Sequence, residues 1–259
     1  MADLKVSVAG VEFHNPLIAA SGTFGFGREY AEFYPLSALG GISSKGITLK
    51  ARPGNPAPRI AEAPGGMLNA VGLQNPGVDH FIEKDLPWLR EQGVTIIANI
   101  AGNTPEDYCA MAEKLNDTDI DMIEMNISCP NVKQGGVQFG TSCAGVEDIT
   151  KAVRAHCKKP LMVKLSPNVT DISEIALAAE SAGADAVSMI NTLTGMRIDI
   201  NTKRPIIHNN TGGFSGPALL PIAVRMVWQT YQKVKIPIVG LGGISTWQDA
   251  VEMLLAGAT

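Results

Sequence analysis

The chain has 259 residues, 45% of them hydrophobic, which is enough for one large α/β domain or two small ones. Its formal charge of −4 and its lack of dense Lys or Arg runs argue against a nucleic-acid partner. No stretch approaches the roughly 18 uninterrupted apolar residues of a membrane span, and residues 1–8 lack a signal-peptide pattern, so we expect a cytoplasmic protein without a membrane partner.

An N-terminal β-hairpin is expected first, with strand-like residues 5–8 and 11–13 around a turn at Ala9 and Gly10. Apolar, strand-length runs then alternate with helical segments, at residues 16–20, 41–45, 95–100, 122–127, 161–165, 186–190 and 236–241. Helix starts are marked by capping residues within 104–107, 170–174 and 245–249. This alternation predicts a parallel sheet and an α/β fold of the (β/α)8 TIM-barrel type. No linker interrupts it, so we expect a single domain over residues 1–259.

The last residues predict an incomplete barrel. The ending Leu-Ala-Gly-Ala-Thr at 255–259 is similar to Ser-Ala-Gly-Ala at 181–184, which leads directly into the sixth predicted strand. No strand follows the second copy. We therefore expect a barrel that lacks its eighth strand and is C-terminally incomplete.

The cysteines do not predict a metal site. Cys109, Cys129, Cys143 and Cys157 form no C-x-x-C pair and no grouping with histidine, so we expect neither a metal ion nor an iron–sulfur cluster in this chain. Cys109 and Cys157 fall in helix-like segments, where a cysteine is usually a small buried hydrophobic residue.

Polar residues or glycines lie at or near the end of every predicted strand. They are Ser21-Gly22, Lys45-Gly46, Asn99, Asn126 to Cys129, Lys164 with Ser166, Asn191-Thr192 and Gly242-Gly243. The lysines could be salt-bridged core residues, the asparagines turn formers and the glycines a tight turn. However, buried ammonium and amide groups are costly unless a ligand or partner satisfies them, and barrel sites form at these strand ends. Together the residues favour a binding site.

Residues 126–131, Asn-Ile-Ser-Cys-Pro-Asn, resemble the active-site strand of the soluble dihydroorotate dehydrogenases, which bind FMN and use a cysteine as base. Further similar motifs follow the family order, at 15–22, 44–48, 54–59, 67–77, 163–168, 190–192, 212–216 and 240–243. The run at 67–77 most resembles the NAD-linked class 1B branch. There the catalytic subunit works with a partner that carries FAD and an iron–sulfur cluster.

The resemblance implies a role for individual positions, with Cys129 as the general base. The flavin contacts it implies are Ser21, Lys45, Gly46, Asn99, Asn126, Lys164, Ile190, Gly216, Gly242 and Gly243. The substrate contacts it implies are Lys45, Asn69, Ala70, Val71, Gly72, Leu73, Asn126, Asn191 and Thr192. Asparagine amides, each with a donor and an acceptor, match the edges of a pyrimidine, and a lysine can face a carboxylate.

The implied function is oxidation of dihydroorotate to orotate in pyrimidine biosynthesis. Electrons would pass from FMN through the partner subunit to NAD, in a heterotetramer built on a homodimer of this chain. The polar, glycine-rich residues 130–140 suggest a mobile lid, or else an ordered surface loop.

Three other functions stay open at this point. Lys164 could be the Schiff-base lysine of an aldolase-type barrel, although that leaves Cys129 and the asparagines unused. The chain could be another flavin barrel that acts on pyrimidines, similar to dihydropyrimidine dehydrogenase. It could also be a truncated barrel without catalytic activity.

Overall fold

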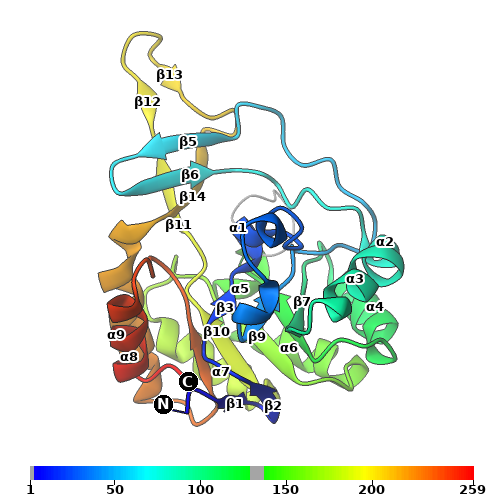
Figure 1. The fold of residues 1–259 in the computed structure, drawn as a ribbon. Coiled ribbons are helices and arrows are strands. Elements are labelled where there is room, and N and C mark those ends of the chain that lie inside the picture. Colours follow the sequence, from blue (N-terminus) through cyan, green and yellow to red (C-terminus); the bar gives the residue numbers. More distant parts are fainter. Residues whose placement is uncertain (1–2, 129–136) are drawn as a thin grey trace.

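The computed structural model describes residues 3–128 and 137–259. Its central feature is a curled sheet of seven parallel strands, each beside the next parallel strand of the chain (Figure 1). The strands are β3 (Ile18–Ala19), β4 (Gly41–Ser43), β7 (Thr95–Ile100), β8 (Met122–Asn126), β9 (Leu161–Lys164), β10 (Ala186–Met189) and β15 (Ile238–Gly240). They match the seven predicted runs, and the order is that of a TIM barrel. The predicted fold class is therefore confirmed.

The two edges of this sheet are β3 and β15. Within the described residues no eighth parallel strand lies between them, as the sequence predicts. The backbone N–H of Thr259 donates to the carbonyl of Ile238 at 2.9 Å, so the last residue lies beside the start of β15.

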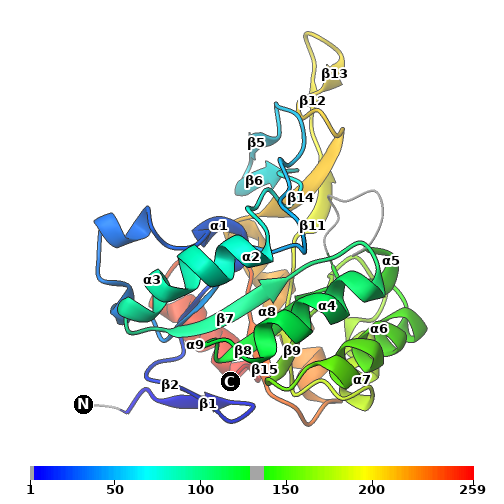
Figure 2. The same ribbon diagram turned by 90° about the vertical axis from the view of Figure 1, so that its right-hand side faces the viewer.

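Helices cover the outer face of the sheet (Figures 1 and 2). They are α4 (Pro105–Asn116), α6 (Cys143–His156), α7 (Ile172–Ser181), α8 (Leu220–Tyr231) and α9 (Trp247–Leu255). Capping boxes at Thr104 and Thr246 begin α4 and α9, and the Asp171 side chain caps α7, each within a predicted start. Cys157, expected inside a helix, lies just beyond α6 as its C-cap, because the chain turns there into β9. Its side chain is buried, as predicted.

The predicted N-terminal hairpin is present as β1 (Val6–Val8) and β2 (Val11–Phe13), and it covers the N-terminal end of the strands. Val8 and Phe13 are almost completely buried there, in a cluster with Met122 and Met162 from the barrel interior. The hairpin therefore closes one end of the barrel and leaves the carboxyl ends of the strands for a ligand.

A second, antiparallel sheet stands over those carboxyl ends, and the sequence did not predict it (Figure 1). It consists of β5 (Ile60–Ala63), β6 (Gly66–Asn69), β11 (Leu193–Met196) and β14 (Thr211–Ser215), beside a short arm of β12 (Ile198–Asp199) and β13 (Arg204–Pro205). These strands belong to the long connections that follow β4 and β10. The sheet forms a wall above the barrel opening.

Short helices complete the connections. They are α1 (Ser21–Phe24), η1 (Tyr30–Glu32), η2 (Leu36–Ala38), α2 (Val78–His80), the π-helical turn η3 (Phe81–Asp85), α3 (Leu86–Glu91), α5 (Val137–Gly140) and η4 (Pro217–Leu219). In the described residues, no helix is both long enough and apolar enough to cross a bilayer.

Candidate active site

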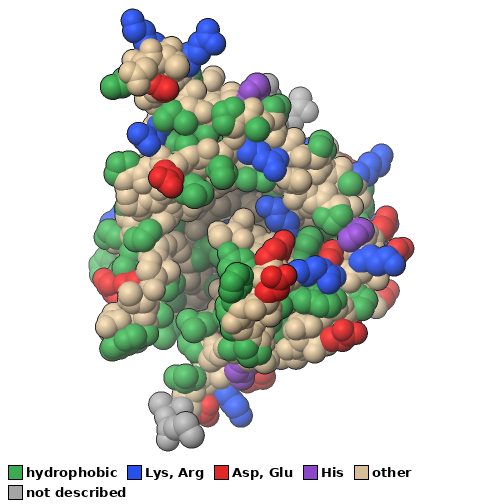
Figure 3. Space-filling view, turned by 45° about the horizontal axis from the view of Figure 1, so that its top comes forward, with side chains coloured by type: hydrophobic (Ala, Val, Ile, Leu, Met, Phe, Trp, Pro, Cys, Tyr) green, Lys and Arg blue, Asp and Glu red, His purple; other side chains and the backbone are tan. Residues whose placement is uncertain are grey.

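A pocket of about 1180 Å³ occupies the carboxyl ends of the parallel strands. It opens as a hollow below the second sheet (Figure 3) and continues between the edge strands, where Ile18 of β3 and Val239 of β15 line it. Both sheets contribute polar groups to its wall. This is where the ligand site of a parallel barrel is expected.

Most of the residues that the sequence singled out line this pocket. They are Ser21, Lys45, Gly46, Asn69, Val71, Gly72, Leu73, Asn99, Asn126, Lys164, Ile190, Asn191, Thr192, Gly216, Gly242 and Gly243. Ala70 is the predicted substrate residue that does not line it; its side chain is fully buried elsewhere, and its carbonyl accepts a hydrogen bond from Asn55 Nδ2. Cys129 and most of the predicted lid, residues 129–136, lie outside the described residues.

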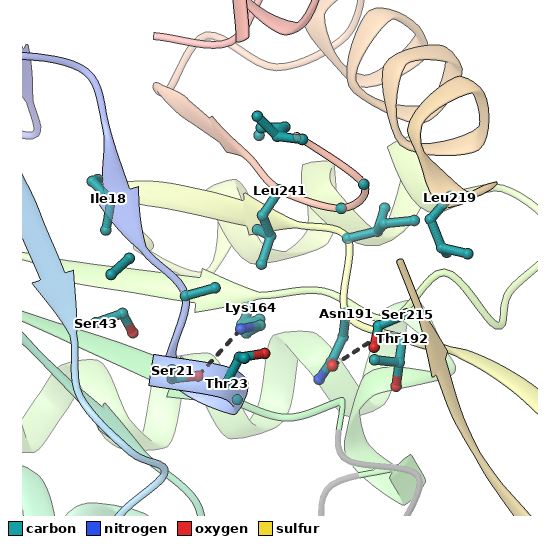
Figure 4. Close-up of a pocket in the computed structure, with 18 of the residues that line it drawn as sticks. Ile18, Ser21, Thr23, Ser43, Lys164, Asn191, Thr192, Ser215, Leu219 and Leu241 are labelled. Carbon is teal, nitrogen blue, oxygen red and sulfur yellow. Dashed lines mark hydrogen bonds between the residues drawn. The ribbon is translucent and has the colours of Figure 1, made fainter. Parts of the chain in front are cut away.

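Lys164, at the end of β9, places an ammonium group in the pocket. Its side chain is only 5% exposed, and Nζ donates to the hydroxyl of Ser21 at 3.5 Å (Figure 4). Ser21 comes from α1, directly after β3, so this contact joins two distant parts of the barrel. Lys45, the second predicted lysine, follows β4 by two residues and is half-buried. Its backbone N–H donates to the Gly25 carbonyl at 2.8 Å.

Two of the asparagines at the strand ends, Asn126 and Asn191, form a hydrogen-bonded network with Ser128. Asn191 donates from Nδ2 to Ser128 Oγ at 2.7 Å and to Asn126 Oδ1 at 3.4 Å. Ser128 is fully buried, and its N–H also donates to Asn126 Oδ1. Behind them, the Tyr108 hydroxyl donates to the Asn126 carbonyl at 2.9 Å. The amide groups are therefore held at fixed positions on the pocket wall.

The second sheet contributes Asn69, at the end of β6. Its Nδ2 donates to the carbonyl of Gly213 on β14 at 3.4 Å. Close approach of the chains here depends on glycine, since a Cβ on Gly213 would lie 2.0 Å from Thr192 Oγ1. Gly216 has a φ of 134°, which favours glycine, and a Cβ there would lie 2.4 Å from the Gly66 backbone. These glycines let the upper wall pack closely, with Gly213 against Thr192 and Gly216 against Gly66.

A carboxylate that the sequence analysis missed lies beneath this network. Glu124 of β8 is 3% exposed and accepts hydrogen bonds from Ser43 Oγ at 2.5 Å and from Ser188 Oγ at 2.6 Å. Asn99 donates to it from Nδ2 at 2.5 Å. Burial alone would raise the pKa of Glu124, but the charge of Lys164 and these three hydrogen bonds outweigh it and hold the pKa below its ordinary value. The sequence signal was a lone acidic residue in an otherwise apolar strand, two positions before Asn126.

Comparison with known proteins identifies the family. A family model described as dihydroorotate dehydrogenase matches residues 3–259. The chain belongs to the dihydroorotate dehydrogenase family. A relative from Alkaliphilus metalliredigens is 59% identical over 257 residues, which cover 99% of this chain and 85% of its own. Relatives from Bacteroides thetaiotaomicron and Geobacter sulfurreducens are 57% and 55% identical, covering 100% and 99% of this chain and 86% and 85% of their own. All three are named "Dihydroorotate dehydrogenase B (NAD(+)), catalytic subunit".

Dihydroorotate dehydrogenases are flavin-dependent, and the pocket fits a flat ring with polar edges. Asn99 Oδ1 is buried and accepts no hydrogen bond within the described chain, so it can accept one from a ring N–H. A Cβ on Gly46 would lie 3.0 Å from Leu73 Cδ2 and 3.1 Å from Asn99 Oδ1, so glycine keeps this part of the wall open. Lys164 adds positive charge nearby.

Glu124 should make the stability of the fold depend on pH. Because its folded pKa lies below the ordinary value of 4.5, the ionised side chain stabilises the fold fully above that value. This contribution is lost as the pH falls through the folded pKa. We expect the free energy of urea unfolding to decline below about pH 5, with a shallower decline in Glu124→Gln. Asp117→Asn, which removes an exposed carboxylate, is the control, and equal slopes in wild type and Glu124→Gln would contradict the prediction.

Proposed function

We propose that this chain is the catalytic subunit of an NAD-linked dihydroorotate dehydrogenase, which oxidises dihydroorotate to orotate in pyrimidine biosynthesis. The observation that carries the proposal is the pocket wall. There, buried Lys164 lies beside the Asn126–Ser128–Asn191 network, and buried Asn99 presents an Oδ1 that has no hydrogen-bond partner among the described residues. Family membership favours this function over the aldolase, over other pyrimidine-reducing flavin barrels and over a non-catalytic barrel.

FMN is the flavin that we propose for the pocket, where it would accept hydride from the substrate. Its ring would contact Asn99, Lys164 and the glycines at 46 and 216. Its phosphate would lie at Gly242 and Gly243, whose φ values of 121° and 81° favour glycine and let the backbone come close to an anion. The Lys164 ammonium would stabilise negative charge that develops on the ring during reduction.

Dihydroorotate would be held by the amides of Asn69, Asn126 and Asn191, each of which carries both a donor and an acceptor. Lys45 would face the substrate carboxylate. The hydrogen bonds among Asn126, Ser128 and Asn191 support this assignment, because they fix the amide groups before substrate arrives. Val71, Gly72, Leu73 and Thr192 would shape the remaining wall.

Cys129 would be the general base that removes a proton from a substrate carbon. The proposal for this residue comes from the family motif and from its position directly after Ser128. A thiol with an ordinary pKa of about 8.5 is mostly protonated at neutral pH, so its proton must leave before it can act. A lid that excludes water would include residues 130–136, and it too remains a proposal.

A separate electron-transfer subunit is implied by the relatives, whose names specify a "catalytic subunit" of an NAD(+) enzyme. We propose that this partner carries FAD and an iron–sulfur cluster, and that it joins a homodimer of this chain in a heterotetramer. The sequence contains neither a dinucleotide-binding glycine motif after a strand nor cysteines spaced for a cluster, in keeping with this division. We propose that residues 1–259 form one flavin-binding domain.

The electron route gives a direct test. The purified, FMN-loaded chain is expected to oxidise dihydroorotate with an artificial dye as acceptor but not to reduce NAD. Adding the electron-transfer subunit of a relative should start NADH formation, followed by absorbance. The same subunit without this chain is the control.

Two results would contradict the proposal. Rapid NAD reduction by the single chain would remove the need for a partner. Efficient turnover with fumarate would place the chain in the branch of the family that does not use one.

A further inference from the structure

Glu124 is a buried charge whose position the proposed reaction does not explain. Its carboxylate binds Ser43 of β4, Asn99 of β7 and Ser188 of β10, so one side chain of β8 joins three other strands inside the barrel. Burying an ion is costly, and replacing one by an apolar residue is often neutral or stabilising. The stability of the fold alone therefore does not explain why a carboxylate, rather than an apolar side chain, occupies this position.

Strand register places Glu124 opposite Asn99 of β7, one same-face position before Asn126 on β8. Asn126 is paired with Lys164, and Lys164 with Ser188, across β8, β9 and β10. Glu124 lies two residues before Asn126 on the same strand face, about 6–7 Å deeper in the barrel. Both side chains line the pocket, and the Lys164 ammonium is close enough for its charge to act on the carboxylate.

The same carboxylate fixes the orientation of Asn99. An ionised carboxylate only accepts hydrogen bonds, so the amide nitrogen of Asn99 must face Glu124. The amide oxygen is then the end that remains for the pocket, and it is buried without a partner among the described residues. Glu124 thus determines that Asn99 presents an acceptor to the ligand.

We propose that Glu124 is a positioning residue that sets the affinity of the bound flavin for electrons. It holds Asn99 with its acceptor toward the ring and offsets part of the Lys164 charge, so that the reduced, anionic ring is stabilised less than Lys164 alone would stabilise it. This inference rests on the proposed binding of FMN. It concerns a residue that lines the deep end of the pocket and is proposed to act through Asn99 and Lys164.

The test is Glu124→Gln in the FMN-loaded protein. Removing the negative charge is expected to raise the midpoint potential of the flavin and to tighten sulfite binding about tenfold, equivalent to about 30 mV for a two-electron couple. Sulfite adds to oxidised flavins and leaves a negative charge on the ring, so its dissociation constant follows the same electrostatics without any catalytic turnover. Glu124→Asp keeps the charge and should remain within a few-fold of wild type.

Two other variants give internal comparisons. Lys164→Gln should shift the potential and the sulfite affinity in the opposite direction. Asp85→Asn neutralises another buried carboxylate, which pairs with Arg28 and His80 outside the pocket, and should leave both quantities unchanged. A purely structural role for Glu124 would change unfolding stability but not the sulfite constant.

If Glu124→Gln does not retain FMN, the sulfite affinity of Ser188→Ala is compared with that of the wild type instead. It removes one donor from the carboxylate but leaves its charge, which becomes less dispersed, so sulfite binding should weaken. Unchanged or weaker sulfite binding in Glu124→Gln, or unchanged or tighter binding in Ser188→Ala, would overturn the inference. Failure of the wild type to bind FMN would instead overturn the proposed function, and the inference with it.

Discussion

The Cys129→Ser protein is expected to bind FMN and orotate but to oxidise dihydroorotate about 10²- to 10⁴-fold more slowly at neutral pH. A hydroxyl is a far weaker acid than a thiol, so serine gives much less of the deprotonated base. Stopped-flow measurement of flavin reduction by dihydroorotate isolates this step from later electron transfer. The rate should be compared at saturating substrate.

Cys143→Ser is the matched control, since Cys143 is exposed at the start of α6. It should reduce flavin at the wild-type rate. An unchanged rate in Cys129→Ser, with substrate saturating, would remove Cys129 from the mechanism.

Replacing Lys164 by glutamine is expected to slow flavin reduction by roughly 10²- to 10³-fold, the usual cost of removing a preorganised electrostatic group. Lys164 is buried in the pocket wall, so little solvent screening weakens its effect on the developing negative charge. Its loss also leaves Glu124 without the nearby positive charge. The same stopped-flow experiment measures the rate.

Lys158→Gln is the control, because it removes a lysine charge that is 75% exposed outside the pocket. The double variant Glu124→Gln with Lys164→Gln should recover part of the lost flavin potential, since it removes both charges. Wild-type reduction rates in Lys164→Gln would contradict its proposed role.

The barrel could be predicted from sequence because its strands carry a strong local signal. Runs such as residues 95–100 and 122–127 are apolar and short, as expected for strands buried on both faces. The capping residues at Thr104 and Thr246 likewise act within one helical turn. The polar residues at the predicted strand ends then identified most of the pocket wall, because parallel strands bring their carboxyl ends together at one edge of the sheet.

The second sheet could not be predicted in the same way. Its strands are four or five residues long and only partly buried, and their apolar residues Ile60 and Met67 stay exposed beside the pocket. Pairing of Leu68 with Phe214 joins segments that are distant in sequence, so neither segment shows it alone.

Glu124 was missed for a related reason. The role of Glu124 depends on the strand register that brings Ser43, Asn99 and Ser188 to one carboxylate. No spacing in the sequence indicates that these residues meet. A single acidic residue among apolar ones in 122–127 was the available sign. Inward-facing charges in predicted barrel strands are therefore worth testing as site residues.

The central claim is that this chain holds FMN and reduces it with dihydroorotate, and anaerobic titration tests it most directly. Dihydroorotate should bleach the visible absorbance of the FMN-loaded protein and yield orotate in equal amount to the flavin reduced. Dihydrouracil, which lacks the carboxylate that Lys45 would face, should bleach it far less. Persistent oxidised-flavin absorbance in the presence of excess dihydroorotate, or equal bleaching by dihydrouracil, would contradict the claim.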